Sequence, residues 1–127
     1  MALDKKTVGL SADAQLAVDT IMETGMFRDQ MDVAKLGLAL AIARRLPPTE
    51  MAGVPTKWNV GSFDQDGQVR NSVLALYSDY QTPYRIAESL MNQGVPMLLE
   101  YIDGSGDLDL EGLLDEATAS VGDASPA

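Results

Sequence analysis

The side chains best suited to chemistry in this chain are carboxylates, and three of them lie in one region. Asp64, Asp66 and Asp79 could gather as oxygen ligands for a metal ion. Asp64 and Asp66 lie close to Gly67, however, and aspartates beside a glycine more simply form the hydrogen bonds of a turn. We therefore predict a turn here and no metal site.

A second group of acidic residues, at positions 103–109, resembles the beginning of a calcium-binding loop. Such a loop needs glycine at its sixth position and a bidentate glutamate at its twelfth. Those positions hold Leu108 and Leu114. We interpret the segment as a solvated turn.

The chain contains no cysteine and no histidine. These absences exclude a disulfide framework, thiol nucleophiles and thiolate metal sites, and they remove the commonest general base and metal ligand. Enzymes built from carboxylates, lysine or tyrosine remain conceivable. We predict a non-enzymatic protein that uses no cofactor.

The formal net charge of −10 is unevenly distributed along the 127 residues. Residues 1–85 hold all nine basic side chains and ten acidic ones, whereas residues 86–127 hold nine acidic side chains and no basic one. Acidic segments usually solvate a surface, repel nucleic acid or bind a basic partner. Any contact with phosphate is therefore expected from the first 85 residues.

Apolar residues make up 46% of the chain, but no apolar run approaches the roughly 20 residues that a bilayer span requires. Lys5 and Lys6 are followed by no apolar signal core. We predict a cytoplasmic protein without membrane contact.

Hydrophobic periodicity and capping residues predict a mainly α-helical chain. We expect a strand at 5–10, then helices at 12–23 and 30–45, with Ser11 and Asp29 as their N-caps and Gly25 ending the first. A loop at 47–67 precedes helices at 68–78, 83–93 and 97–102. Residues 1–103 form one helical domain, and residues 104–127 form an acidic helix (108–119) and tail.

The helix at 30–45 is apolar on nearly every side, and such a helix must be covered on nearly every side. We predict that a second copy of the chain covers it, making the protein a homo-oligomer. Gly37 within this helix indicates a close backbone crossing. The predicted oligomer interface consists of apolar residues of the strand and this helix: Val8, Leu10, Met31, Leu36, Leu38, Leu40 and Ile42.

The order of strand, helix, glycine turn and capped helix over residues 1–46 resembles the ribbon-helix-helix module. The segment 23–33, Glu-Thr-Gly-Met-Phe-Arg-Asp-Gln-Met-Asp-Val, is similar to the turn between the two helices of that family. The resemblance implies a ribbon of two strands from two chains, with Lys5, Thr7 and Gly9 facing the DNA major groove. A helical hairpin that only dimerises is the alternative interpretation.

Gly53-Val54-Pro55 and the later Asp64-Gln65-Asp66-Gly67-Gln68 element extend the resemblance to about residues 7–95. In this order they resemble the DndE-type family of bacterial DNA phosphorothioation and phage-defence systems. That resemblance implies a helical, homo-oligomeric, DNA-associated protein working beside an ATPase and a sulfurtransferase.

The leading functional hypothesis is a non-catalytic, homo-oligomeric accessory protein that binds duplex DNA. The predicted nucleic-acid-binding residues are Lys5, Lys6, Thr7, Arg28, Lys35, Arg44, Arg45 and Arg70. The aromatic side chains Trp58, Tyr77, Tyr80 and Tyr84 could stack on bases, although core packing is the commoner role of such residues. Two alternatives are an adaptor that docks its acidic C-terminal segment on a basic partner, and an antitoxin that neutralises a toxin with that segment.

Overall fold

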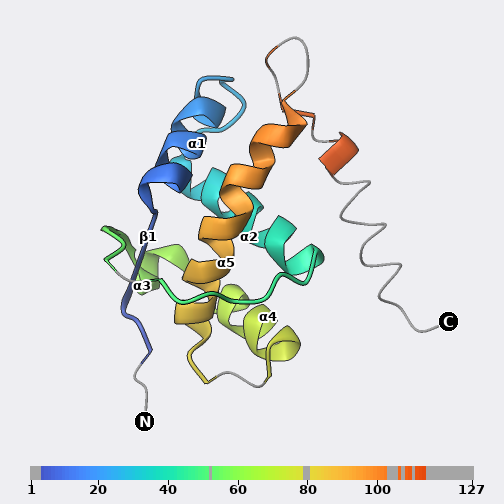
Figure 1. The fold of residues 1–127 in the computed structure, drawn as a ribbon. Coiled ribbons are helices and arrows are strands. Elements are labelled where there is room, and N and C mark those ends of the chain that lie inside the picture. Colours follow the sequence, from blue (N-terminus) through green and yellow to red (C-terminus); the bar gives the residue numbers. More distant parts are fainter. Residues whose placement is uncertain are drawn as a thin grey trace, which may run out of the picture.

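The computed structural model describes residues 4–51, 53–78, 81–102, 106, 108–109 and 111–113. Its elements follow the order β1 (Thr7–Gly9), α1 (Ala12–Met22), α2 (Gln30–Ala43), β2 (Thr56–Asn59), α3 (Val60–Phe63), α4 (Gln68–Leu76), α5 (Pro83–Met97) and a 3-10 turn, η1 (Leu98–Tyr101). The prediction of a mainly helical chain is confirmed. In Figure 1, α5 runs through the middle of the molecule and the other elements surround it.

The ends of the first two helices lie close to where their capping residues predict them. The Ser11 hydroxyl accepts a hydrogen bond from the amide of Ala14, and the Asp29 carboxylate accepts one from the amide of Met31. Gly25 adopts the left-handed conformation, with φ of 74°, just after α1. Local capping chemistry therefore determines this helical hairpin.

The two strands form an antiparallel sheet within one chain, with Thr7 opposite Asn59 and Val8 opposite Trp58. The ribbon-helix-helix resemblance implied instead that the strand would pair with a second copy. The predicted loop at 47–67 is wrong in its second half, because β2 and α3 lie there. Residues 56–59 have no periodicity of their own, and they become a strand because β1 supplies the hydrogen-bonding partners.

Helix α5 continues through Gly94 and Pro96 to Met97, so the predicted break at Gly94 and the separate helix at 97–102 are wrong. A proline in the last turn removes one hydrogen bond, yet its fixed φ suits a helix. Gly94 has a packing role instead, because it lies where α2 crosses α5.

The crossing of α2 and α5 brings two backbones into contact. A Cβ atom added to Gly94 would lie 1.8 Å from the carbonyl oxygen of Gly37, and one added to Gly37 would lie 2.7 Å from the Cα atom of Val95. No side chain larger than hydrogen fits at either position. The close crossing predicted from Gly37 is confirmed.

The single chain covers most of α2 by itself. Val33, Ala34, Gly37, Leu38, Leu40 and Ala41 are buried in the described structure, without any second copy. The premise that α2 cannot be sheltered within one chain is therefore wrong, because α5 packs along it. Of the predicted oligomer interface, Val8, Leu10, Leu38 and Leu40 are core residues, whereas Met31, Leu36 and Ile42 are partly buried.

Part of the acidic C-terminal segment packs on the helical body. Leu108 forms an antiparallel bridge with Ile102, and Leu108 and Leu113 are both buried in the core. Residues 111–113 are helical, and the part of the predicted helix and tail from 114 onward lies outside the described residues. Asp79, Tyr80 and most of the calcium-like loop also lie outside them. Within the described part of the chain, no helix is long and apolar enough to cross a membrane.

We expect Gly94→Ala to lower the free energy of unfolding by about 3 kcal/mol, because the new methyl group overlaps the Gly37 carbonyl. Gly61→Ala is the matched control, since a Cβ atom at Gly61 meets nothing within 4 Å. Urea denaturation of both variants measures the difference. Equal stability of the two variants would contradict the close crossing.

Candidate functional site

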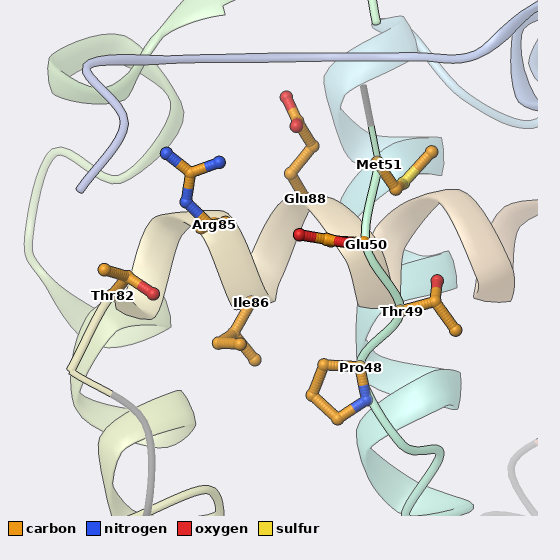
Figure 2. A pocket seen from close by; sticks show the side chains of 8 residues that line it. All are labelled: Pro48, Thr49, Glu50, Met51, Thr82, Arg85, Ile86 and Glu88. Carbon is orange, nitrogen blue, oxygen red and sulfur yellow. The ribbon is translucent and has the colours of Figure 1, made fainter. Parts of the chain in front are cut away.

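The described surface contains a cavity of about 430 Å³ between the segment 48–51 and the first half of α5. Figure 2 shows the side chains of Arg85 and Glu88 on one side of α5 and that of Ile86 on the other, with Pro48 and Glu50 on the segment that passes the helix. Glu88 is the buried charged residue of this lining, 2% exposed. Glu88 could act as an acid or a base in the cavity only if its carboxylate were free of structural hydrogen bonds.

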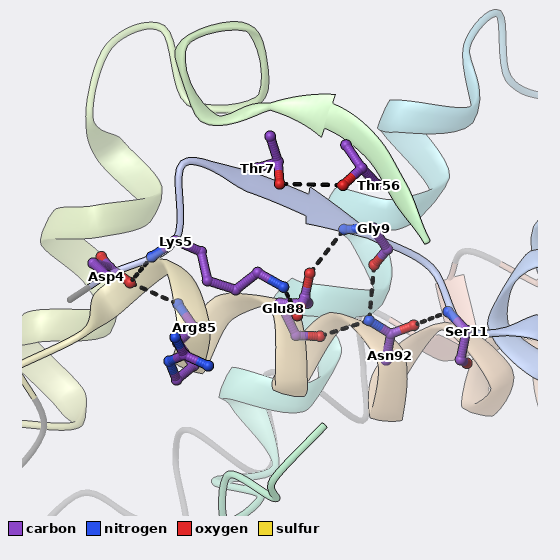
Figure 3. Close-up of polar contacts among 9 residues, drawn as sticks. All are labelled: Asp4, Lys5, Thr7, Gly9, Ser11, Thr56, Arg85, Glu88 and Asn92. Carbon is purple, nitrogen blue, oxygen red and sulfur yellow. Dashed lines mark hydrogen bonds and ion pairs between the residues drawn. The ribbon is translucent and has the colours of Figure 1, made fainter. Parts of the chain in front are cut away.

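Both carboxylate oxygens of Glu88 already have partners in the N-terminal segment (Figure 3). Oε1 accepts a hydrogen bond of 2.7 Å from the Lys5 ammonium, and Oε2 accepts one of 2.9 Å from the Gly9 amide. A buried carboxylate needs such a paired charge and donor to be stable. Glu88 is therefore a structural anchor for β1, and Lys5, a predicted phosphate contact, is bound to it.

Asn92, one turn further along α5, completes this anchor. Its side-chain amide donates to the carbonyl oxygens of Gly9 and Glu88, and its oxygen accepts the amide of Ser11. The N-terminal segment is also held at the start of α5, where the Asp4 carboxylate accepts the amides of Tyr84 and Arg85. Asp4 thus caps the N-terminus of α5 in place of Thr82, the residue before the helix, which makes no side-chain capping bond.

A different face of the molecule brings cations together around two aromatic rings. Trp58 of β2 stacks on Phe63 of α3, with ring centroids 6.0 Å apart. The ammonium of Lys35 lies 5.5 Å from the Phe63 centroid, and that of Lys57 lies 5.6 Å from the Trp58 centroid. Both distances permit cation–π attraction, which holds the two ammonium groups at this surface.

Two further cations belong to segments that are hydrogen-bonded next to this pair of rings. The backbone carbonyl of Lys6 accepts the amide of Val60, the first residue of α3, and the Lys6 side chain is exposed. Arg70, also exposed, lies in the first turn of α4, and its backbone amide donates to the carboxylate of Asp64, the residue after Phe63. We call Lys6, Lys35, Lys57, Trp58 and Arg70 the cationic face.

Asp64 lies beside the cationic face, but its charge is directed inward. Its carboxylate accepts the amides of Val69 and Arg70 at the start of α4, and the hydroxyl of Tyr84. Burial raises the pKa of Asp64, yet these hydrogen bonds and the charge of Lys35 outweigh it and hold the pKa below its ordinary value of 3.8. Burial and the Asp64 carboxylate raise the pKa of Tyr84 to about 12.

The remaining predicted DNA contacts include Arg28, Arg44, Arg45 and Thr7, and the structure gives Arg44 and Thr7 hydrogen-bond partners. Arg28 lies in the turn between α1 and α2, and Arg44 and Arg45 follow α2, so about 20 Å of helix separates the two ends. Arg44 donates to the Tyr101 hydroxyl at 2.6 Å, and the Thr7 hydroxyl lies 3.3 Å from that of Thr56. Of the predicted residues, Lys35 thus lies at the ring pair, and Lys6 and Arg70 belong to segments whose backbones bond to α3 and to Asp64.

Lys57 is the member of the cationic face that the sequence analysis did not assign. Its position beside Trp58 is the signal in the sequence, but a loop was predicted for residues 47–67, where strand β2 places the two side chains. Of the other predicted aromatic residues that the structure describes, Tyr77 and Tyr84 pack against the core, and their hydroxyls donate to the Leu46 carbonyl and to Asp64. Asp64 and Asp66 form turn and capping hydrogen bonds, and the described residues contain no cluster of acidic side chains fit to hold a metal ion.

Comparison with known proteins adds no further assignment: no family model, no curated protein and no solved structure matches this chain.

We expect Lys5→Met to lower the free energy of unfolding by about 3 kcal/mol, because Glu88 would remain buried without its counter-charge. Adding Glu88→Gln to that variant should recover part of the loss, since no buried charge is then unpaired. Lys6→Met, a change at the exposed neighbouring lysine, is the control and should alter stability by less than about 0.5 kcal/mol. Similar losses from Lys5→Met and Lys6→Met in urea denaturation would contradict the anchor.

The Asp64–Tyr84 pair predicts how stability depends on pH. The pKa of Asp64 is lowered by folding, so its contribution is present above the unfolded value and is lost as the pH falls through the lowered pKa. The pKa of Tyr84 is raised from 10.0 to about 12, so its contribution is present below pH 10 and is lost as the pH rises toward 12. Tyr84→Phe should reduce the alkaline loss, and urea denaturation of this variant and the wild type across this range measures the difference.

Proposed function

We propose that this chain is a non-catalytic, DNA-associated accessory protein that binds the phosphates of duplex DNA through its cationic face. The observation that carries the proposal is that Lys35 and Lys57 lie over the Trp58–Phe63 ring pair, with Lys6 and Arg70 in segments hydrogen-bonded next to it, in a chain whose net charge is −10. A local group of cations on an acidic protein supports a specific use, because solubility alone does not require it.

The described contacts support binding rather than catalysis. The buried carboxylates Glu88 and Asp64 are engaged in structural hydrogen bonds, and the chain has no cysteine or histidine to act as nucleophile or base. The ammonium groups of Lys35 and Lys57, by contrast, lie over aromatic rings, on side chains that are partly exposed. Lysine and arginine at such positions are suited to phosphate oxygens.

The biological setting of the proposal comes from the resemblance to the DndE-type family. We propose that the protein acts in a bacterial DNA-modification or phage-defence system, beside an ATPase or another protein of the same operon. Association between copies would use the partly buried Met31, Leu36 and Ile42, since the other predicted interface residues lie in the core.

The proposal predicts that Lys35→Gln with Lys57→Gln weakens duplex binding by about tenfold or more and makes it less salt-dependent, because two phosphate contacts are lost. Fluorescence anisotropy of a labelled duplex, titrated at several salt concentrations, measures both effects. Trp58 is the only tryptophan, so its fluorescence should also change on binding.

The matched control is Arg28→Gln with Arg45→Gln, which removes the same charge from exposed positions outside the cationic face. This variant should bind within about twofold of the wild type. Equal weakening by both double variants would show that only total charge matters. A dissociation constant above ~10⁻⁴ M at low salt would contradict the proposal of DNA binding.

A further inference from the structure

Helix α1 leaves a large apolar side chain on its outer face. Leu16 is 67% exposed, the highest value among the exposed large apolar residues of the described structure. The opposite side of the helix, with Ala14, Ala17, Val18 and Ile21, is buried in the core. Leu16 therefore contributes little to the packing of its own chain, and burying it elsewhere would remove apolar surface from water.

Acidic side chains surround Leu16 on this outer face. At 100° per residue, Asp13, Asp19 and Glu23 fall within about 60° of Leu16 around the helix axis. All three are exposed. The Asp19 carboxylate accepts a hydrogen bond from Gln15, and among the described residues Asp13 and Glu23 have no ion-pair partner.

The residues that precede and follow α1 in the sequence add to this negative charge. Residues 7–34 contain one basic side chain, Arg28, whereas Asp29 and Asp32 extend the acidic surface beyond α1. This end of the molecule repels phosphate and anionic lipid. It also repels a second α1, so two copies cannot pair face to face here.

We propose that the outer face of α1 docks a basic amphipathic helix of a partner protein. An apolar side chain of that helix would cover Leu16, while lysines or arginines beside it would pair with Asp13, Asp19 and Glu23. Charge complementarity would orient the partner helix, and burial of Leu16 would remove apolar surface from water. The proposal uses none of the residues of the cationic face, so it does not rest on DNA binding.

The probe is a synthetic amphipathic helix with leucines on one face and lysines flanking them, together with a scrambled peptide of the same composition. Isothermal titration of the full chain measures the affinity for each peptide. The amphipathic peptide should bind about tenfold more tightly than the scrambled one, because only it presents leucine and lysine together to the helix face.

Two variants test the site. Leu16→Lys should weaken binding of the amphipathic peptide by about tenfold or more, and Asp13→Asn with Asp19→Asn and Glu23→Gln should do the same while reducing the salt dependence. The charge-matched control, Glu50→Gln with Asp66→Asn and Glu111→Gln, removes three exposed carboxylates elsewhere and should bind within about twofold of the wild type.

Three outcomes would overturn the proposal. Equal binding of the scrambled peptide, or equal weakening by the control variant, would show that total charge alone explains the affinity for the peptide. If sedimentation shows that the wild type is an oligomer and that Leu16→Lys dissociates it, this face binds another copy of the chain and not a partner helix.

Discussion

The contact between the backbones of α2 and α5 is the constraint on which the rest of the structure depends. Because Gly37 and Gly94 carry no side chains, the two helices approach until a single added carbon atom would overlap a carbonyl oxygen. That approach lets α5 cover the apolar side of α2 within one chain. It also makes α5 the common neighbour of α1, α4 and β1, so every other element is positioned relative to it (Figure 1).

The polar side chains of α5 extend this constraint to the N-terminal segment. Glu88 and Asn92 bind one edge of β1, while the other edge pairs with β2, so both edges of this strand are occupied within the chain. A two-chain ribbon would require breaking one set of these bonds. The same arrangement engages Lys5 with Glu88 and places Trp58 of β2 opposite Val8, beside α3. The cationic face is therefore a consequence of the intrachain sheet.

Local chemistry made the helices predictable, and long-range contacts made the rest difficult to predict. Ser11, Gly25 and Asp29 mark helix ends through hydrogen bonds that span only a few residues. Strand β2 and the continuation of α5 through Gly94 depend on partners about 50 residues away in the sequence. Hydrophobic periodicity describes only local structure and cannot reveal such partners. For the candidate site, the sequence identified Lys6, Lys35 and Arg70 as cations, but only the fold shows that Lys35 and Lys57 meet at one ring pair and that Lys5 is bound to Glu88.

Net charge is a poor guide to what such a chain binds, because a ligand responds to the charges within about one Debye length, roughly 8 Å at physiological salt. Around Trp58 those charges include two lysine ammonium groups within 6 Å of aromatic rings. Around Leu16 they are three exposed carboxylates. A ligand at the first surface therefore meets a positive potential and a ligand at the second meets a negative one, although both belong to a protein of net charge −10. Because different residues form the two surfaces, the charges of one can be changed without replacing a residue of the other, and binding at each surface can be measured separately.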